Sequence, residues 1–178
     1  MRTTPYAVLG LLSLAPMSGY DLRKEASTSI GYFWSESYGQ LYPALRELTA
    51  AGLIRRRGTR RRARERQVYE ITDRGREALA AWRREAPRTR PVRNELLLKL
   101  FFGEPKAVDT EIGWIEALRG EESEALAEFR KIRRELERTQ AGHPSRPFWL
   151  LTLSYGEHRS RAVERWCRET LRALRAMR

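Results

Sequence analysis

The sequence contains very little cysteine and no long hydrophobic run, and each absence narrows what the protein can be. A single cysteine, Cys167, among 178 residues excludes a disulfide within the chain, and we interpret it as a buried structural thiol. This favours a reducing compartment, so we expect a cytoplasmic protein. The apolar run after Arg2 is far shorter than the roughly 20 residues that span a bilayer. It resembles a signal peptide, but Pro16 would directly follow the cleavage site, so we expect a mostly buried helix with Thr4 as N-cap and Pro5 as first residue.

Groups that carry catalysis are also scarce. His143 and His158 are the only histidines, and neither lies beside a motif partner. The sequence has no glycine-rich loop of the kind that binds phosphate and no paired spacing of metal ligands. We therefore expect no enzyme activity, no metal and no cofactor, and we interpret both histidines as surface or capping residues. Three clustered glutamates, Glu121, Glu122 and Glu124, are expected to lie on a solvated helix face.

Positive charge is what the sequence has in excess, and it is concentrated in one place. The formal net charge is +12. Residues 1–86 hold 16 basic and 9 acidic residues, and the segment 55–66 alone holds eight arginines and one glutamate. Outside that segment, this half of the chain has equal numbers of each sign. Such a local patch favours a polyanionic partner, and a solvated or disordered charge run is the alternative interpretation.

The segment before the arginines predicts a short helix, the third in the chain. Ser37 and Gln40 have the spacing of a capping box, which places Pro43 in the second turn. There we expect a kink rather than a break. Gly52 is expected to cap the C-terminus of this helix. The stripe predicted to face the core consists of Leu41, Leu45 and Leu48.

Other helices and a hairpin surround this element. Ser18 and Asp21 also have capping-box spacing, which starts a second helix over 19–29. Two short segments rich in β-branched or aromatic residues flank the arginines and predict a β-hairpin with an arginine-rich tip. A fourth helix is expected from Thr72–Asp73 to about residue 85, and the prolines in 87–91 indicate a linker.

The second half of the chain is expected to be helical. A short apolar helix ends at Gly103, a long helix runs from about 105 to 140, and a last helix runs from about 148 to 177. Their near-periodic apolar residues predict packing against each other and against a second subunit. The stripe of the last helix consists of Leu151, Tyr155, Ala162, Trp166 and Leu174. The predicted fold class is mainly α with a small β-hairpin, with a winged helix-turn-helix domain at 1–87 and an α-helical dimerisation domain at 88–178.

Three helices followed by a hairpin is the order of a winged helix-turn-helix protein, whose third helix enters the major groove of DNA. The N-terminal turn of that helix is the predicted reading surface, formed by Ser37, Tyr38, Gly39 and Gln40, with Tyr42 and Arg46 one turn further on. Gln40 can bind adenine through two hydrogen bonds, and Arg46 can reach a guanine or a phosphate. The hairpin arginines are expected to bind phosphates, because each guanidinium donates two parallel hydrogen bonds and keeps its charge. They are Arg60, Arg61, Arg62, Arg64 and Arg66.

These motifs resemble the PadR family of transcriptional regulators. The N-terminal signature of that family is similar to QLYPALRELTAAGLI followed by VYEITDRG, and SGYDL belongs to the same pattern. The start of the family's longer C-terminal dimerisation region resembles NELLLKLFFG. The resemblance covers nearly the whole chain, and it implies a homodimeric DNA-binding repressor, occasionally an activator, that a small effector often releases. It also implies a DNA-binding surface that includes or adjoins Tyr20, Ser37, Gln40, Tyr42 and Pro43. The dense arginines of the hairpin depart from the family pattern.

Two further questions stay open at the level of sequence. A non-specific or architectural nucleic-acid-binding protein is the alternative function, because phosphate contacts carry no sequence information. A preference for duplex DNA over RNA at equal salt would separate the two. The five tryptophans are expected to be mainly core or interface anchors. Among them, Trp114 and Trp149 are the candidates for lining the cavity of an apolar or aromatic effector.

Overall fold

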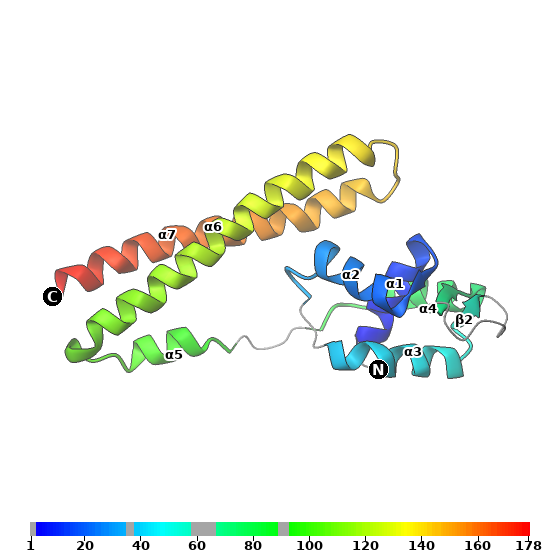
Figure 1. The fold of residues 1–178 in the computed structure, drawn as a ribbon, viewed down its shortest axis with the longest axis horizontal. Coiled ribbons are helices and arrows are strands. Elements are labelled where there is room, and N and C mark those ends of the chain that lie inside the picture. The colour runs from blue at the N-terminus through cyan, green and yellow to red at the C-terminus, as the bar shows by residue number, and fades with distance from the viewer. Residues whose placement is uncertain (1–2, 35–37, 58–66, 89–92) are drawn as a thin grey trace. The chain divides into compact units, whose positions relative to one another are not determined.

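The structure is a computed structural model that describes residues 3–34, 38–57, 67–88 and 93–178. The chain divides into two compact units, Met1–Thr89 and Arg90–Arg178 (Figure 1). Both are mainly helical, and a small antiparallel sheet belongs to the first, which confirms the predicted fold class. Among the described helices, none combines the length and the apolar character of a membrane span.

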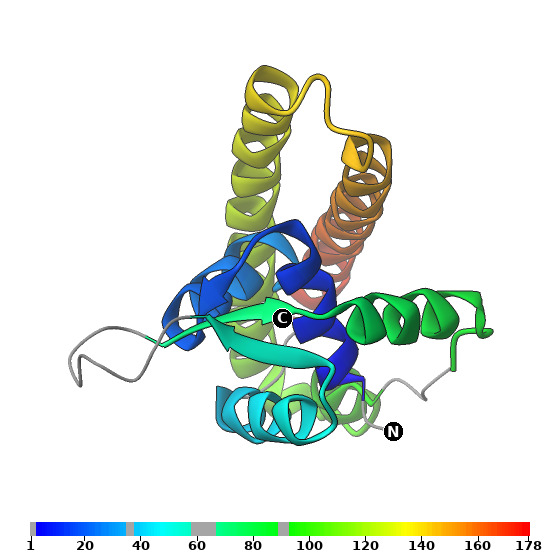
Figure 2. The same ribbon diagram turned by 90° about the vertical axis from the view of Figure 1, so that its right-hand side faces the viewer.

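The described part of the first unit contains four α-helices, a 3-10 turn and three short strands. In chain order they are α1 (Thr4–Leu14), β1 (Met17–Ser18), α2 (Gly19–Ser29), η1 (Tyr38–Gln40), α3 (Leu41–Ala50), β2 (Ile54–Arg57), β3 (Val68–Ile71) and α4 (Asp73–Arg84). Strands β2 and β3 lie side by side as the predicted hairpin, with Ile54 opposite Ile71 (Figure 2). The sequence did not predict β1, which pairs antiparallel with the other edge of β3.

The first two helices begin in different ways. At α2 the Ser18 hydroxyl accepts a hydrogen bond from the Asp21 N–H at 3.2 Å, and the Asp21 carboxylate accepts one from the Ser18 N–H at 3.3 Å. The predicted capping box is therefore present, and it satisfies two backbone donors that the helix leaves free. α1 begins one residue earlier than predicted, since Thr3 is the N-cap, Thr4 is already helical and Pro5 is the second residue.

The start of α3 also differs from the prediction. Ser37, the expected N-cap, lies outside the described residues, and α3 begins at Leu41 after the 3-10 turn. Gln40 is its N-cap and makes no side-chain capping bond. Pro43 is therefore the third residue of the helix, where the N–H that proline lacks is one that a helix leaves unbonded in any case. The proline thus requires neither the expected kink nor a break.

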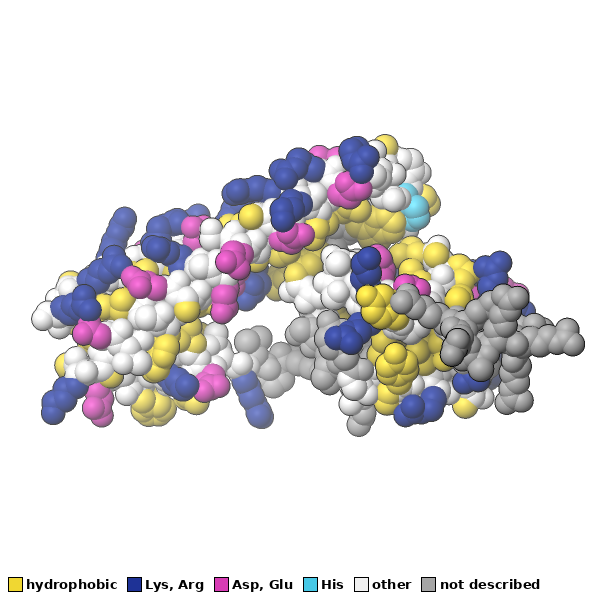
Figure 3. Space-filling model, in the orientation of Figure 1, with side chains coloured by type: hydrophobic (Ala, Val, Ile, Leu, Met, Phe, Trp, Pro, Cys, Tyr) yellow, Lys and Arg dark blue, Asp and Glu magenta, His cyan; other side chains and the backbone are white. Residues whose placement is uncertain are grey.

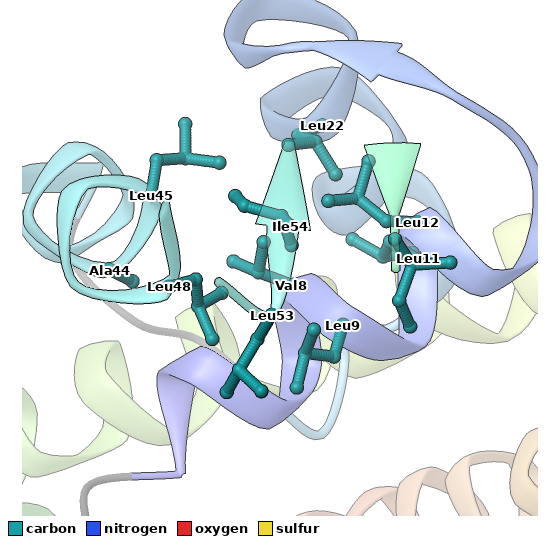
Figure 4. Packing of buried hydrophobic residues seen from close by; sticks show 11 residues of the cluster. Val8, Leu9, Leu11, Leu12, Leu22, Ala44, Leu45, Leu48, Leu53 and Ile54 are labelled. Carbon is teal, nitrogen blue, oxygen red and sulfur yellow. The ribbon is translucent and has the colours of Figure 1, made fainter. Parts of the chain in front are cut away.

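The core of the first unit joins α1, α2, α3 and the sheet. Leu9, Leu22 and Leu48 are fully buried at its centre. Of the predicted α3 stripe, Leu45 and Leu48 are buried and Leu41 packs against the edge of the cluster. Figure 4 shows the cluster, whose labelled members are Val8, Leu9, Leu11, Leu12, Leu22, Ala44, Leu45, Leu48, Leu53 and Ile54. Because this core holds one face of α3, the opposite face is left to solvent.

The second unit is a long helical hairpin with a short helix at one end. Its elements are α5 (Glu95–Phe101), η2 (Pro105–Ala107), α6 (Val108–Thr139) and α7 (Arg146–Ala176). α6 and α7 run antiparallel along each other (Figure 1), and ion pairs join Asp109 to Arg178 at one end and Arg133 to Glu157 toward the other. Figure 3 shows basic and acidic side chains interspersed along the outer surface of this hairpin.

Only the C-terminal part of the predicted stripe of α7, Trp166 and Leu174, packs against α6. Leu151 and Tyr155 are 67% and 65% exposed, and Ala162 is exposed as well. Trp166 is half-buried against the core. The apolar and small residues that are buried on α7 are Leu153, Gly156, Ser160, Cys167, Leu171 and Leu174. Cys167 is fully buried, as expected, and this burial raises the pKa of its thiol.

One glutamate that was expected on a solvated face is buried instead. Glu122 is 5% exposed and forms an ion pair with Arg159 of α7 at 3.0 Å. A second pair lies in the same hairpin, where Glu157 accepts a hydrogen bond from Arg133 at 2.9 Å and forms an ion pair with Arg161. The hydrogen bond from Arg133, aided by Arg161, holds the pKa of Glu157 below its ordinary value. Glu122 of α6 pairs with an arginine of α7, and Glu157 of α7 pairs with an arginine of α6, so the pattern of either helix alone does not reveal these partners.

Candidate nucleic-acid interface

The outward face of α3 carries three of the predicted DNA-binding residues. Tyr42 and Arg46 lie one turn apart, and both are exposed, Tyr42 by 57%. Pro43 is exposed beside them, while Leu45 and Leu48 bury the opposite face. The major groove of B-DNA is wide enough to admit a helix, so side chains on such a face can reach base edges and adjacent phosphates.

The N-terminus of α2 meets the same face of α3. A Cβ built on Gly19 would lie 3.1 Å from Cε1 and 3.5 Å from Oη of Tyr42, so the tyrosine ring packs directly on the α2 backbone. The next residue, Tyr20, is 56% exposed. Tyr20 of α2 and Tyr42 of α3 are distant in the sequence, but their helices meet at Gly19. Sequence reasoning missed Gly19, because the contact depends on how α2 packs on α3 and leaves no local signal.

The other end of α3 is fixed by a glycine turn that leads into the sheet. Gly52 has a φ of 69°, the left-handed conformation that glycine adopts without strain, and it ends the helix as predicted. The N–H of Leu53 donates to the carbonyl of Leu48 at 2.9 Å, and the N–H of Gly52 donates to that of Thr49 at 3.1 Å. These two bonds form a Schellman motif, in which Leu53 and Leu48 are both buried. The helix and strand β2 are thus held in a defined relation.

Helix α4 locks this corner from the other side. The Thr72 hydroxyl donates to the carbonyls of Gly52 and Leu53 and accepts from the N–H of Gly75 at 3.1 Å, so one side chain joins α3, β2 and α4. A Cβ on Gly75 would overlap the Leu53 carbonyl oxygen and lie 2.8 Å from Cγ1 of Ile71. Only glycine allows this approach of α4 to the sheet. The corner therefore supports α3 as a rigid element.

Strand β2 adds basic side chains next to α3. Arg55, Arg56 and Arg57 are exposed, and the Nε of Arg55 donates to Glu70 of β3 at 2.5 Å. Neither Arg56 nor Arg57 forms an ion pair within the described residues, so their charges are available to an anion. Sequence reasoning did not include these two in the DNA-binding set. Their position in the strand that leads to the other arginines is the signal that could have identified them.

The remaining predicted DNA-binding residues are only partly described. Gly39 and Gln40 lie in η1 directly before α3, where Gly39 is exposed and Gln40 half-buried. Tyr38 is the first residue of η1. Ser37 and the hairpin arginines lie outside the described residues, and these arginines are Arg60, Arg61, Arg62, Arg64 and Arg66.

The two tryptophans predicted to contact an effector lie far apart in the second unit. Trp114 is in the second turn of α6, and Lys99 of α5 places its Nζ 5.5 Å from the centre of the indole ring. Trp149 is in the first turn of α7 and stacks on His143, with ring centres 4.4 Å apart. Because the helices are antiparallel, these tryptophans occupy opposite ends of the hairpin. They therefore do not share one cavity within a single chain.

The chain is similar to regulators of transcription along nearly its whole length. The model of the "Transcriptional regulator PadR-like family" matches residues 8–81, and that of "Virulence activator alpha C-term" matches 92–175. The chain is 38% identical over 104 residues to the "Negative transcriptional regulator PadR" of Bacillus subtilis, a stretch that covers 57% of each protein. It is 34% identical over 143 residues to the "Probable transcriptional regulator Rv1176c" of Mycobacterium tuberculosis, covering 72% of this chain and 74% of that protein.

Solved structures show the same architecture. Bacillus subtilis PadR in complex with operator DNA superposes with a TM-score of 0.77 at 26% identity, over 97% of this chain and 99% of that one. The same protein in complex with p-coumaric acid gives a TM-score of 0.71 over the same shares of both chains. These relatives are regulators rather than enzymes, as expected. From its matched motifs and its winged-helix architecture, the chain belongs to the PadR-like family of DNA-binding transcriptional regulators.

Proposed function

We propose that the chain is a sequence-specific repressor whose helix α3 reads the major groove of a near-palindromic operator. The observation that carries this proposal is the exposed face of α3, which a packed core and a hydrogen-bonded corner hold in place. Gln40, Tyr42 and Arg46 contact base edges or the adjoining phosphates, and Tyr20 approaches the backbone from the start of α2. Ser37, Tyr38, Gly39 and Pro43 complete this surface.

In this proposal the hairpin arginines clamp the DNA without reading it. Phosphates present the same charge along every sequence, so such contacts add affinity and fix orientation but not specificity. Arg56 and Arg57 of β2 extend the clamp toward α3. Its outer part consists of Arg60, Arg61, Arg62, Arg64 and Arg66.

We further propose that residues 88–178 form a homodimerisation domain, while 1–87 bind DNA. Apolar side chains on two helices of the second unit are exposed in the single chain. On α7, Phe148, Leu151 and Tyr155 follow one another at helical spacing and are 62%, 67% and 65% exposed, and on α5 Phe101 is 82% exposed. Removing such surface from water favours association. A two-fold dimer places two recognition helices about 34 Å apart, one turn of DNA, which matches a palindrome.

A small apolar or aromatic effector completes the proposal. Bacillus subtilis PadR is a negative regulator and has been crystallised with p-coumaric acid. By analogy, we propose that an effector binds in the second unit, in contact with Trp114 or Trp149, and releases the protein from DNA in the cytoplasm. Release requires that the effector bind the DNA-free arrangement more tightly than the DNA-bound one.

Selection of binding sites from random duplex DNA, followed by affinity measurements, tests the reading role of α3. Tyr42→Ala and Arg46→Ala should weaken binding to the selected operator about ten- to a hundredfold, since a lost base contact is worth roughly 1–3 kcal/mol of discrimination. Binding to random DNA should change much less. Arg83→Ala removes an exposed arginine from α4 and serves as the control. Equal losses on operator and random DNA would instead support a non-specific nucleic-acid-binding protein.

Light scattering tests the proposed assembly. The purified full-length protein should have the mass of two chains at micromolar concentration. A stable monomer under those conditions would refute the dimer and the palindromic operator with it.

A further inference from the structure

An open pocket lies in the second unit where α5, η2 and the first turns of α6 meet. Its volume is about 480 Å³, within the range that accommodates small organic ligands. Its walls are largely apolar and include Leu98, Phe102, Ala107 and the indole of Trp114. All of these belong to one unit, so the pocket exists in a single chain.

The pocket also holds the carboxylate of a glutamate for which the described part of the chain supplies no partner. Glu111 of α6 lines it and is only 5% exposed. Within the described part of the chain, this carboxylate accepts no hydrogen bond and forms no ion pair. A Cβ on Gly103 would overlap its Oε1, so the carboxylate lies against another residue of the pocket wall. A carboxylate without a paired cation attracts one, and the positive end of the α6 dipole supplies only part of that positive charge.

The other charged groups of the pocket leave it negative. Lys99 and Glu104 also line it, which gives two carboxylates and one ammonium in a chain whose net charge is +12. The Lys99 ammonium is already paired with Glu95 one turn earlier in α5, at 2.8 Å. It therefore does not neutralise Glu111. The pocket is an acidic site within a basic protein.

An internal cation already occupies an aromatic face of this pocket. The Lys99 ammonium lies 5.5 Å from the centre of the Trp114 ring, within the distance of a cation–π interaction. The lysine is 52% exposed on a flexible stem, so a ligand can displace it at low cost. Its position indicates where a ligand cation would find both an aromatic face and a nearby carboxylate.

We propose that this pocket binds a small organic cation that carries an aromatic or alkyl body, with Glu111 pairing its charge and Trp114 and Phe102 contacting its body. This inference rests on the proposed function in one respect, since it specifies the chemical class of the effector. It sets this chain apart from a regulator that takes a phenolic acid, because the carboxylate of such a ligand would be repelled by Glu111.

The test is titration of the ¹⁵N-labelled, full-length, DNA-free protein with benzyltrimethylammonium, followed through the indole N–H signals of the tryptophans. The Trp114 signal is assigned by its loss in Trp114→Phe. It should shift on titration, and p-coumarate should leave it unchanged at the same concentrations. Glu111→Gln, which keeps the size of the side chain, should weaken binding at least tenfold. Glu104→Gln, at the exposed rim of the same pocket, should change it less than twofold.

Several results would overturn the proposal. One is a Trp114 signal that does not shift on titration with benzyltrimethylammonium, in protein whose amide spectrum shows that it is folded. An equal loss of cation affinity in Glu111→Gln and Glu104→Gln would mean that the pocket attracts cations only through its general negative charge, without a specific pair to Glu111. Stronger binding of p-coumarate, especially in Glu111→Gln, would make the pocket an anion site. If Glu111→Gln instead weakens self-association in sedimentation, a second copy supplies the missing cation.

The stability of the Glu111→Gln variant does not limit the test. Should that variant fail to fold, Trp114→Leu should abolish the response of the folded protein to the cation, measured by calorimetry, and undiminished binding would refute the site. Operator affinity of the unliganded protein is measured separately. If the unliganded protein does not bind the operator, the proposed function is wrong, whereas the cation titration still decides whether the pocket binds a cation.

Discussion

Gly19 is expected to act on DNA binding through Tyr42, and Gly19→Ala tests this directly. The added Cβ would lie 3.1 Å from Cε1 of the tyrosine ring, a few tenths of an ångström closer than ordinary van der Waals contact. Because the ring is 57% exposed, it can move away at little cost. The substitution therefore shifts a side chain on the proposed reading face of α3 without straining the core.

The magnitude follows from the contact that is displaced. A base contact is worth roughly 1–3 kcal/mol, and a displaced ring retains part of it, so we expect a loss of about 0.5 kcal/mol in each protomer. A dimer that binds two half-sites then loses about 1 kcal/mol, which is roughly a fivefold decrease in operator affinity. Stability should stay constant or rise, because alanine is a better helix former than glycine by up to about 1 kcal/mol.

The assay is a double-mutant cycle on operator affinity, measured by fluorescence anisotropy at fixed salt, with thermal unfolding measured in parallel. In the Tyr42→Ala background, Gly19→Ala should have no further effect, since the ring it displaces is absent. Gly10→Ala in α1 is the control, because no atom lies within 4 Å of the added Cβ. Full additivity of the two substitutions would refute the mechanism, and so would a loss of stability that parallels the loss of affinity.

Three further outcomes are expected. Gly75→Ala should destabilise the first unit by about 1–3 kcal/mol, because its Cβ overlaps the carbonyl oxygen of Leu53, just before β2, whereas Gly10→Ala should not; thermal melts of both variants check this. Glu157 has a lowered pKa when folded, so its stabilising contribution is present above the ordinary value of 4.5 and is lost as pH falls through the folded value. The difference in unfolding free energy between wild type and Glu157→Gln should accordingly shrink below about pH 4.5, and a difference that is independent of pH would contradict this. Changing Arg61 and Arg62 together to alanine should flatten the slope of log affinity against log salt by about two units in a dimer, since each phosphate contact contributes about 0.9 and only about half of these side chains face the DNA. The loss should be equal on operator and random DNA, and an unchanged slope with a loss confined to the operator would mean that the hairpin reads bases.

Much of the fold follows from local signals that a single sequence carries. The capping box of Ser18 and Asp21 and the cap at Thr72 mark the starts of α2 and α4, because the groups that they satisfy lie within one turn. The buried positions Leu45 and Leu48 follow from the helical period alone. Together with the arginine-rich hairpin, these signals were sufficient to predict the winged helix and the face of α3 that points outward.

The tertiary structure decided what depends on contacts between distant segments. Three such contacts depend on packing that no local spacing encodes. They are the pairing of β1 with β3, the contact of the Tyr42 ring with Gly19, and the approach of Gly75 to the Leu53 carbonyl before β2. The same reason explains the burial of Glu122, which was expected on a solvated face. An arginine from α7 reaches it, and only the pairing of two helices supplies that partner. The sequence alone determined the helices, the hairpin and the outward face of α3, because their signals are local, and the packing between elements determined the contacts that join distant segments.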